Sequence, residues 1–199
     1  MNHLFFATLF EAKPFISSSM KKIAESPEIY EGEFRVIIIG TGLVQAAINC
    51  TKYFQRIKIQ HSDEFINLGI AGSTMDEPIG SVSKIKKICI FTNEKIPESS
   101  LSIWEESYPR IKCENKGKSL ASSLHPVWDE HSKKTLKKTK IDMIDMEGYS
   151  FAKVCEEFSV SYTLYKSVSD NLNKKSQADF LENASIAIRS LFNYYSDLE

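Results

Sequence analysis

Apolar and polar residues alternate along the chain in blocks that predict a succession of strands and helices. Strands are predicted at residues 3–9, 35–39, 65–73, 80–92, 141–146 and 161–168. Helices are predicted at residues 14–25, 43–54, 127–139, 147–158 and 176–195. Residues 93–125, which are rich in Ser and Lys and interrupted by proline, are expected to be the loop-rich part of the chain.

The strongest strand signal is the run from Arg35 to Ile39, because β-branched residues dominate it. It leads through Gly40-Thr41-Gly42 into the helix predicted at 43–54. One face of that helix carries Val44, Ala47, Ile48 and Thr51. Strands that alternate with helices indicate an α/β fold. We expect a single domain over residues 1–199, with a central mixed, mostly parallel twisted sheet flanked by helices on both sides.

Composition and charge exclude several classes of protein. With 25 basic and 26 acidic residues, the net charge of −1 provides no electrostatic case for nucleic acid or a membrane surface as partner. The apolar run from Leu4 to Phe10 is too short to span a bilayer and predicts a buried strand instead. The four cysteines stand far apart without a CxxC pattern, which indicates reduced thiols in a cytoplasmic protein and no zinc site.

Chemically useful residues follow the predicted strands. They are Glu11, the loop Gly40-Thr41-Gly42, the small-residue segment Gly69–Ser73, Glu147 and Asp170. In a sheet of this kind ligands bind outside the carboxyl ends of the strands, so these segments are expected at one edge. Each has a structural explanation by itself: a tight turn for the glycines, the helix dipole for Glu147, and an N-cap or turn for Asp170. Together they place three carboxylates where a glycosidic bond could be cleaved, since such cleavage uses one carboxyl group on either side of the bond.

Two segments carry a resemblance to a known family. The sequence DMEGYSFAKVCEEFSV, followed by YKSVSD, resembles the signature of the nucleoside phosphorylase/nucleosidase superfamily. The nearest branch looks like the methylthioadenosine/S-adenosylhomocysteine nucleosidases, and the futalosine hydrolases of menaquinone biosynthesis are related. Glu11, VIIIGTGLVQAA and INLGIAGS follow in the expected order. The resemblance implies a nucleoside phosphorylase-like fold and a purine nucleosidase.

The resemblance also implies roles for individual residues. Asp170 matches the general acid that protonates N7 of the purine, and Glu11 matches the residue that activates water. Glu147 matches the carboxylate that binds the ribose hydroxyls. Further substrate-binding positions are expected at Met146, Gly72, Ser73, Ser169 and Val127.

Some positions depart from the family pattern. Lys166 stands where the nucleosidases commonly have Arg, and Lys cannot form the same bidentate contacts. The chain is shortened within residues 93–125. Near the base, Ser123, His125, Pro126 and Val127 are expected, without the stacking Phe of the family. His125 is interpreted as a loop residue.

Water is favoured over phosphate as the nucleophile. The related phosphorylases have Arg where this chain has Asn67, and a carboxylate at Glu11 would repel phosphate, although Lys13 lies close by in the sequence. No metal or cofactor is then required.

The substrate is expected to be an adenine nucleoside of the methylthioadenosine/S-adenosylhomocysteine type. The alternatives are a futalosine or aminodeoxyfutalosine hydrolase, a phosphate-dependent phosphorylase and a non-catalytic nucleoside-binding protein. A benzoate-bearing futalosine would suit basic residues such as Lys95, Lys116 and Lys118. A homodimer is expected from the resemblance.

Overall fold

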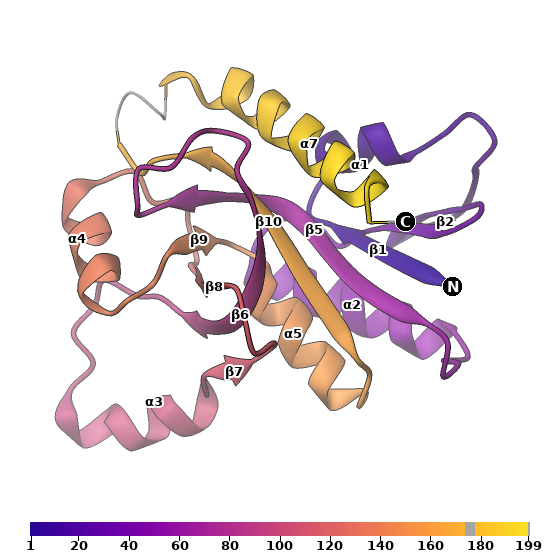
Figure 1. Cartoon of the computed structure of the whole chain (residues 1–199). Coiled ribbons are helices and arrows are strands. Elements are labelled where there is room, and N and C mark those ends of the chain that lie inside the picture. Colours follow the sequence, from indigo (N-terminus) through magenta and orange to yellow (C-terminus); the bar gives the residue numbers. More distant parts are fainter. Residues whose placement is uncertain (174–177, 199) are drawn as a thin grey trace.

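Strands and helices do alternate along much of the chain (Figure 1). The computed structural model describes residues 1–173 and 178–198. Its strands are β1 (Asn2–Phe6), β2 (Lys21–Glu25), β3 (Glu28–Glu31), β4 (Arg35–Ile38), β5 (Glu64–Ser73), β6 (Val82–Ile90), β7 (Ile111–Lys112), β8 (Lys118–Ser122), β9 (Met143–Asp145) and β10 (Tyr162–Asp170). Its helices are α1 (Leu9–Ala12), α2 (Leu43–Arg56), α3 (Leu101–Ser107), α4 (Glu130–Lys138), α5 (Gly148–Glu157) and α7 (Phe180–Ser196), with single 3₁₀ turns at Lys13–Phe15 and Glu98–Ser100.

The described strands belong to one sheet, in the order β10-β6-β8-β9-β5-β1-β4-β3-β2, with β7 beside β6. Strands β4, β1, β5 and β10 run parallel to one another at its centre. Because β10 pairs with β5 as well as with β6, the strands β5, β10, β6, β8 and β9 close into a ring. The expected α/β fold with a mixed sheet is confirmed. The sheet is less parallel than expected, because β2, β3 and β7 pair antiparallel with their neighbours.

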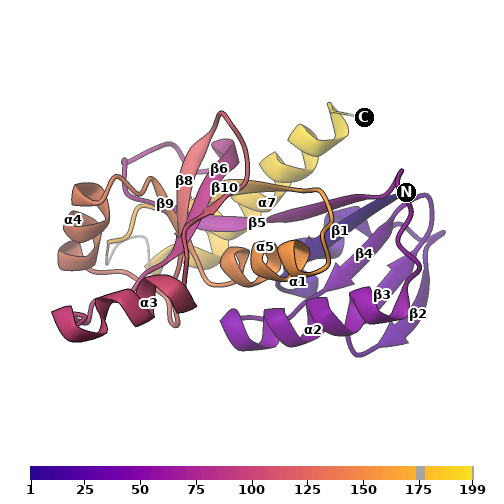
Figure 2. The same ribbon diagram turned by 90° about the horizontal axis from the view of Figure 1, so that it is seen from below.

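Strand β1 shows how the sheet separates two cores. Phe5 points to one side and packs with Tyr53, Phe54 and Phe151 of helices α2 and α5. Leu4 and Phe6 point to the other side, where α7 covers them. This alternation follows from the two-residue period of a strand. Helices α2 and α5 lie on one face of the sheet and α7 on the other (Figures 1 and 2).

The helix predicted at residues 14–25 is wrong. A single 3₁₀ turn, Lys13–Phe15, is followed by β2, which pairs antiparallel with β3. Three consecutive serines, Ser17–Ser19, separate the two segments, and serine favours turns over helix interiors. The strand predicted at 3–9 also ends early, at Phe6, because Thr8 caps helix α1.

One further expectation needs correction. In α2, Val44 and Ile48 of the predicted apolar face are 69% and 44% exposed, whereas Cys50, Tyr53 and Phe54 on another face are buried. The region 93–125 is loop-rich, as expected, and it also contains α3, β7 and the buried strand β8. The other predicted elements are present with shifted ends, and residues 176–177 of the last predicted helix lie outside the described residues. Over the described residues, no helix has the length and apolar character needed to cross a membrane.

Candidate active site

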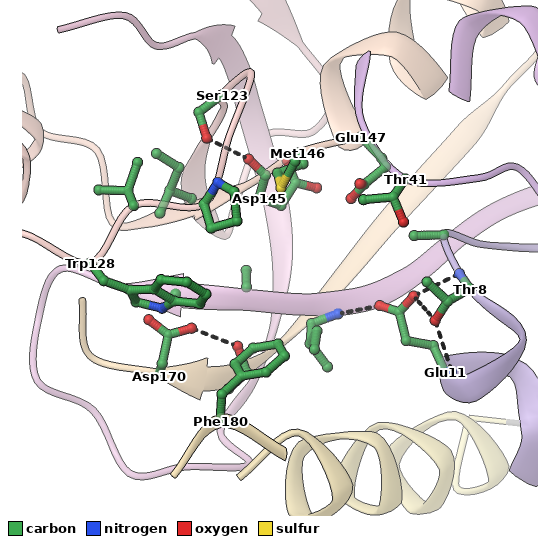
Figure 3. Close-up of a pocket in the computed structure, with 18 of the residues that line it drawn as sticks. Thr8, Glu11, Thr41, Ser123, Trp128, Asp145, Met146, Glu147, Asp170 and Phe180 are labelled. Carbon is green, nitrogen blue, oxygen red and sulfur yellow. Dashed lines mark hydrogen bonds between the residues drawn. The ribbon is translucent and has the colours of Figure 1, made fainter. Parts of the chain in front are cut away.

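A cavity of about 490 Å³ opens at the carboxyl ends of β1, β5, β9 and β10. Segments far apart in the sequence contribute its lining. The lining residues are Ala7, Thr8, Phe10, Glu11, Thr41, Ile70, Ala71, Gly72, Ser123, Pro126, Val127, Trp128, Ile144, Asp145, Met146, Glu147, Ser169, Asp170, Leu172, Phe180 and Leu181. Glu11, Thr41 and Glu147 lie at one end, and Asp170, Trp128 and Phe180 at the other (Figure 3).

Glu11 is held in place by a capping box at the start of α1. Its Oε2 accepts hydrogen bonds from the backbone N–H and the hydroxyl of Thr8, at 2.9 and 3.0 Å. Its Oε1 accepts from the N–H of Ile70 in β5, at 3.2 Å. Burial raises the pKa of Glu11, and the nearby Lys166 ammonium and these hydrogen bonds offset that effect only in part. The local sequence Thr-x-x-Glu therefore fixes a buried carboxylate against the cavity.

Glu147 lies at the N-terminus of α5. Its Oε1 accepts a 2.7 Å hydrogen bond from the N–H of Gly42, a residue with φ of 88° in the region that favours glycine. The Gly40-Thr41-Gly42 turn after β4 thus positions the carboxylate of Glu147, which follows it by more than a hundred residues. Burial, reinforced by the charge of Asp145, raises the pKa of Glu147 to about 7.

Asp145 and Lys166 form an ion pair behind Glu147. Nζ of Lys166 lies 2.8 Å from Oδ2 of Asp145, and the two side chains are 2% and 1% exposed. Asp145 also accepts hydrogen bonds from Ser122 and from the N–H of Gly148. Burial acts against the charge of Lys166, but Asp145, Glu147 and Glu11 together raise its pKa. The buried ammonium group of Lys166 therefore interacts electrostatically with three carboxylates.

Asp170 ends β10 at the other end of the cavity. Its Oδ2 accepts from the hydroxyl of Ser169 at 2.9 Å, and its Oδ1 accepts from the N–H of Leu172 at 3.0 Å. Burial raises the pKa of Asp170 although both hydrogen bonds favour the ionised form. The absence of a side chain at Gly72 leaves space for this carboxylate. A Cβ atom there would lie 2.8 Å from Oδ1 of Asp170 and 2.3 Å from Cδ2 of Leu172.

The predicted site residues mostly meet at this cavity. Glu11, Glu147, Asp170, Met146, Gly72, Ser169 and Val127 all line it. Ser73 does not: it is fully buried at the end of β5, and its hydroxyl donates to Glu77 at 3.3 Å. Its expected place in the pocket is therefore corrected.

Other residues named from the sequence have structural positions. Asn67 is buried in β5, where its amide donates to the carbonyl of Phe5 at 3.1 Å. Lys13 and His125 are exposed and do not line the cavity, whereas Ser123 and Pro126 do. Lys118 pairs with Glu77 outside the cavity.

Three aromatic residues of the cavity are missing from the sequence prediction. Trp128 and Phe180 pack edge to face with their rings 5.8 Å apart, and Trp128 lies beside Asp170 (Figure 3). Phe10 lines the cavity while remaining 50% exposed. The family's stacking Phe is expected near Pro126 and is absent there, whereas Trp128 stands two residues after that proline. A tryptophan directly after Val127, a residue expected near the base, was the available signal.

The arrangement suits proton transfer to one end of a bound molecule and polar contacts at the other. A buried carboxyl group with a raised pKa can hold a proton near neutral pH and donate it. Aromatic rings beside Asp170 can stack on a flat heterocycle. Within residues 1–173 and 178–198, no group of three or more His, Cys, Asp or Glu side chains has the arrangement of a metal site.

The chain was compared with known proteins. The family model described as Phosphorylase superfamily matches residues 119–197. A search of curated protein sequences finds no match.

Solved structures with the same fold are numerous. The 5′-methylthioadenosine nucleosidase of Arabidopsis thaliana superposes with a TM-score of 0.81 at 18% identity, covering 98% of this chain and 93% of that one. The 5′-methylthioadenosine/S-adenosylhomocysteine nucleosidase of Neisseria meningitidis, in complex with methylthio-immucillin-A, gives 0.78 at 15%, covering 96% and 94%. The futalosine hydrolase of Helicobacter pylori gives 0.77 at 19%, covering 98% and 95%. The expected resemblance is confirmed: the chain has the nucleoside phosphorylase/nucleosidase fold and, over residues 119–197, the sequence pattern of the phosphorylase superfamily.

Proposed function

We propose that this protein is a nucleosidase that hydrolyses the N-glycosidic bond of a purine nucleoside. The observation that carries the proposal is the cavity with buried carboxylates at both ends, Asp170 at one and Glu11 with Glu147 at the other. Asp170 donates its proton to N7 of the base as the bond to the sugar breaks. Glu147 binds the ribose hydroxyls, and Glu11 accepts a proton from the attacking water. The base leaves neutral, and the sugar takes the hydroxyl group.

The charges of the cavity support this assignment. Cleavage of the glycosidic bond builds positive charge on the sugar and negative charge on the base. The carboxylates of Glu11 and Glu147 at the sugar end would stabilise the first, and the proton of Asp170 would neutralise the second. The raised pKa of Asp170 favours the protonated form that a general acid needs.

The sugar end favours water over phosphate as the nucleophile. A phosphate dianion is bound by Arg, Lys or a nest of backbone N–H groups. Glu11 and Glu147 present carboxylates there, and the N–H groups of Gly42 and Ile70 already donate to them. Among the described residues that line the cavity, none is Arg or Lys. The buried Lys166 is paired with Asp145.

The mouth of the cavity favours an apolar 5′ substituent. Phe10 and Leu181 line it while 50% and 75% exposed, and they would be covered by a thioether or alkyl group. Lys95, Lys116 and Lys118, the residues considered for a benzoate, are absent from the lining. A methylthioadenosine-type substrate is therefore favoured over a futalosine.

We also propose that the protein is a homodimer. Val44 and Ile48 lie one turn apart on α2, the helix that begins two residues after Thr41 of the cavity. They are 69% and 44% exposed. Leu9 and Phe10 add exposed apolar surface on α1. A second copy that covers α1 and α2 would bury this surface and narrow the cavity mouth.

The reduced cysteines fit a cytoplasmic protein. Cys50 and Cys155 are buried and Cys89 and Cys113 half-buried, and all four are free. Reducing compartments keep thiols in this state. We therefore propose the cytoplasm as the compartment, which fractionation of cells expressing the native chain would test.

The experiment is to measure release of free base by chromatography. The purified chain is incubated without phosphate with methylthioadenosine, S-adenosylhomocysteine, inosine and aminodeoxyfutalosine, and again with phosphate added. The proposal predicts phosphate-independent release, fastest from methylthioadenosine. Release that requires phosphate would instead assign a phosphorylase. Binding without release from any substrate would assign a nucleoside-binding protein.

A further inference from the structure

A second cavity, of about 540 Å³, lies at the opposite edge of the sheet. It is bounded by the amino ends of β1 and β4, the β2–β3 hairpin and the C-terminal end of α2. Its lining residues are Met1, His3, Ile23, Ala24, Ile29, Arg35, Tyr53, Arg56, Ile57, Lys58, Gln60 and Asp63. The two cavities have no lining residue in common.

A chain of buried polar groups forms the floor of this second cavity. Arg35 hydrogen-bonds the hydroxyl of Tyr53, and that hydroxyl hydrogen-bonds Nδ1 of His3. Since a guanidinium only donates, the Tyr53 O–H is free to donate to Nδ1, and the neutral His3 ring then carries its hydrogen on Nε2. Burial lowers the pKa of His3, which favours this neutral ring.

The Nε2–H of His3 is left without a good acceptor. His3 is 2% exposed, and its Nε2 has no hydrogen-bond partner among the described residues. The nearest carboxylate oxygen, Oδ1 of Asp63, lies 3.5 Å away and already accepts from the N-terminal ammonium at 3.2 Å. Because this nitrogen has no exposed surface, it cannot contact a ligand directly, but the ring lies close enough to the cavity for its NMR resonances to report an anion bound there.

The rim of the cavity is basic. Arg35 is half-buried and paired with Glu31. Arg56 and Lys58 are exposed, and within the described part of the chain neither takes part in a hydrogen bond or an ion pair. Asp63 is the acidic residue of the lining, and it also accepts the N–H of Gln60 at 2.8 Å. The cationic side chains of Arg56 and Lys58 are therefore available to bind an external anion.

The remaining wall is apolar. Ile29 is buried, Ala24 and Ile57 are half-buried, and Ile23 is 51% exposed at the edge of the sheet. A group that packs against Ile23 and Ile57 would remove apolar surface from water, which is favourable by about 25 cal/mol per Å². The cavity therefore combines cationic donors with an apolar wall, as sites for small organic ligands do.

We propose that this second cavity binds a small organic anion, whose carboxylate or phosphate group is received by Arg56 and Lys58, close to the buried ring of His3. The apolar body of the ligand packs against Ile23 and Ile57. The site is independent of the proposed nucleosidase reaction and lies at the other edge of the same sheet.

The test is an NMR titration of the full chain labelled with ¹⁵N, following the histidine ring nitrogens. The probes are phenyl phosphate, benzoate and inorganic phosphate. The proposal predicts saturable shifts of the His3 resonances with phenyl phosphate, benzoate or both, while His125 and His131 stay unchanged. Comparing the first two probes shows which anionic group is preferred, and inorganic phosphate should bind at least about tenfold more weakly than the better organic probe because it lacks the apolar body.

Matched variants locate the binding. In Arg56→Gln/Lys58→Gln the affinity for the better probe should fall about tenfold or more, because two charge-assisted contacts are lost. Lys134→Gln/Lys138→Gln removes the same charge from the exposed side of α4 and should bind like the wild type. Asp170→Asn should also bind normally, which separates this site from the first cavity.

Three results would overturn the proposal. One is the absence of saturable shifts of His3 with any probe. Another is equal affinity in the Arg56→Gln/Lys58→Gln and wild-type proteins. The third is inorganic phosphate binding as tightly as the organic probes, since the apolar wall would then contribute nothing.

Discussion

Nζ of Lys166 lies 2.8 Å from Oδ2 of Asp145, and both side chains are almost fully buried behind the carboxylates of Glu11 and Glu147. This ion pair determines the charge at the sugar end of the cavity. Lys166 lowers the cost of keeping Glu11 and Glu147 ionised, whereas Asp145 raises the pKa of Glu147. Lys166 thus acts as a positioning residue that works through its neighbours.

Replacing Lys166 with Met should destabilise the protein by about 3–5 kcal/mol, because it leaves buried carboxylates without their cation. The pKa of Glu11 should rise, so the acidic limb of the pH profile of kcat/KM should move to higher pH. Urea unfolding and the pH profile measure the two effects.

The double variant Asp145→Asn/Lys166→Met is the control for that prediction. It removes the pair together and should recover part of the lost stability, because no additional buried charge remains unpaired. A single Lys166→Met variant with unchanged stability and an unchanged pH profile would contradict the assigned role.

Glu147→Gln should change how stability depends on pH. The pKa of Glu147 is raised from 4.5 to about 7, so the folded chain binds this proton more tightly than the unfolded chain. The resulting stabilisation is complete below about pH 4.5 and is lost as the pH rises through about 7. The free energy of unfolding of Glu147→Gln relative to wild type should therefore rise by about 3 kcal/mol across this window, at ~1.4 kcal/mol per pKa unit.

Urea unfolding at several pH values measures this difference. Glu105→Gln, on the exposed surface of α3, is the matched control and should show no such trend. A constant difference between Glu147→Gln and wild type would contradict the raised pKa of Glu147.

Trp128 should stack on the purine beside Asp170. Stacking of a base on an aromatic ring is worth about 1–3 kcal/mol, so Trp128→Ala should raise KM by about tenfold. Trp104→Ala removes the second tryptophan of the chain, which lies on α3, and should leave KM unchanged. In a Trp104→Phe background, the fluorescence of Trp128 should respond to bound adenine, and an unchanged signal at saturation would argue against stacking.

Val44→Lys tests the proposed dimer. A charge at this exposed position of α2 should dissociate the two copies, which sedimentation velocity would detect as a change from dimer to monomer. Leu198→Lys places the same charge at another exposed leucine, outside the described helices, and should remain dimeric. A monomeric wild-type protein would rule out this assembly.

The sequence predicts much of this architecture because its signals are local. The β-branched run at 35–39 and the segments that end β5 and β10 mark strand ends, and strand ends at one edge of a parallel sheet converge. The second pairing of β10 with β5, which closes the ring, was not predicted because it joins residues about a hundred positions apart. The β2–β3 hairpin is short and largely exposed, so its pattern is weak.

The site shows the same limit. Glu11, Glu147 and Asp170 could be identified because each follows a strand in a familiar order. The ion pair of Lys166 with Asp145 and the ring of Phe180 near Trp128 depend on tertiary packing, which no local pattern encodes. Ser73 was misplaced because its hydroxyl bonds Glu77 outside the cavity lining, a contact that the strand pattern does not reveal.

The most direct test of the central claim is the rate of base release from methylthioadenosine without phosphate, in wild type and in Asp170→Asn. The asparagine oxygen can still accept from the N–H of Leu172, so the fold should persist. Loss of the proton donor should lower kcat about 10²–10⁴-fold, while Asp197→Asn on the exposed C-terminal segment should retain full activity. If Asp170→Asn released base as fast as the wild type, Asp170 would not be the general acid and the account of the reaction would be wrong.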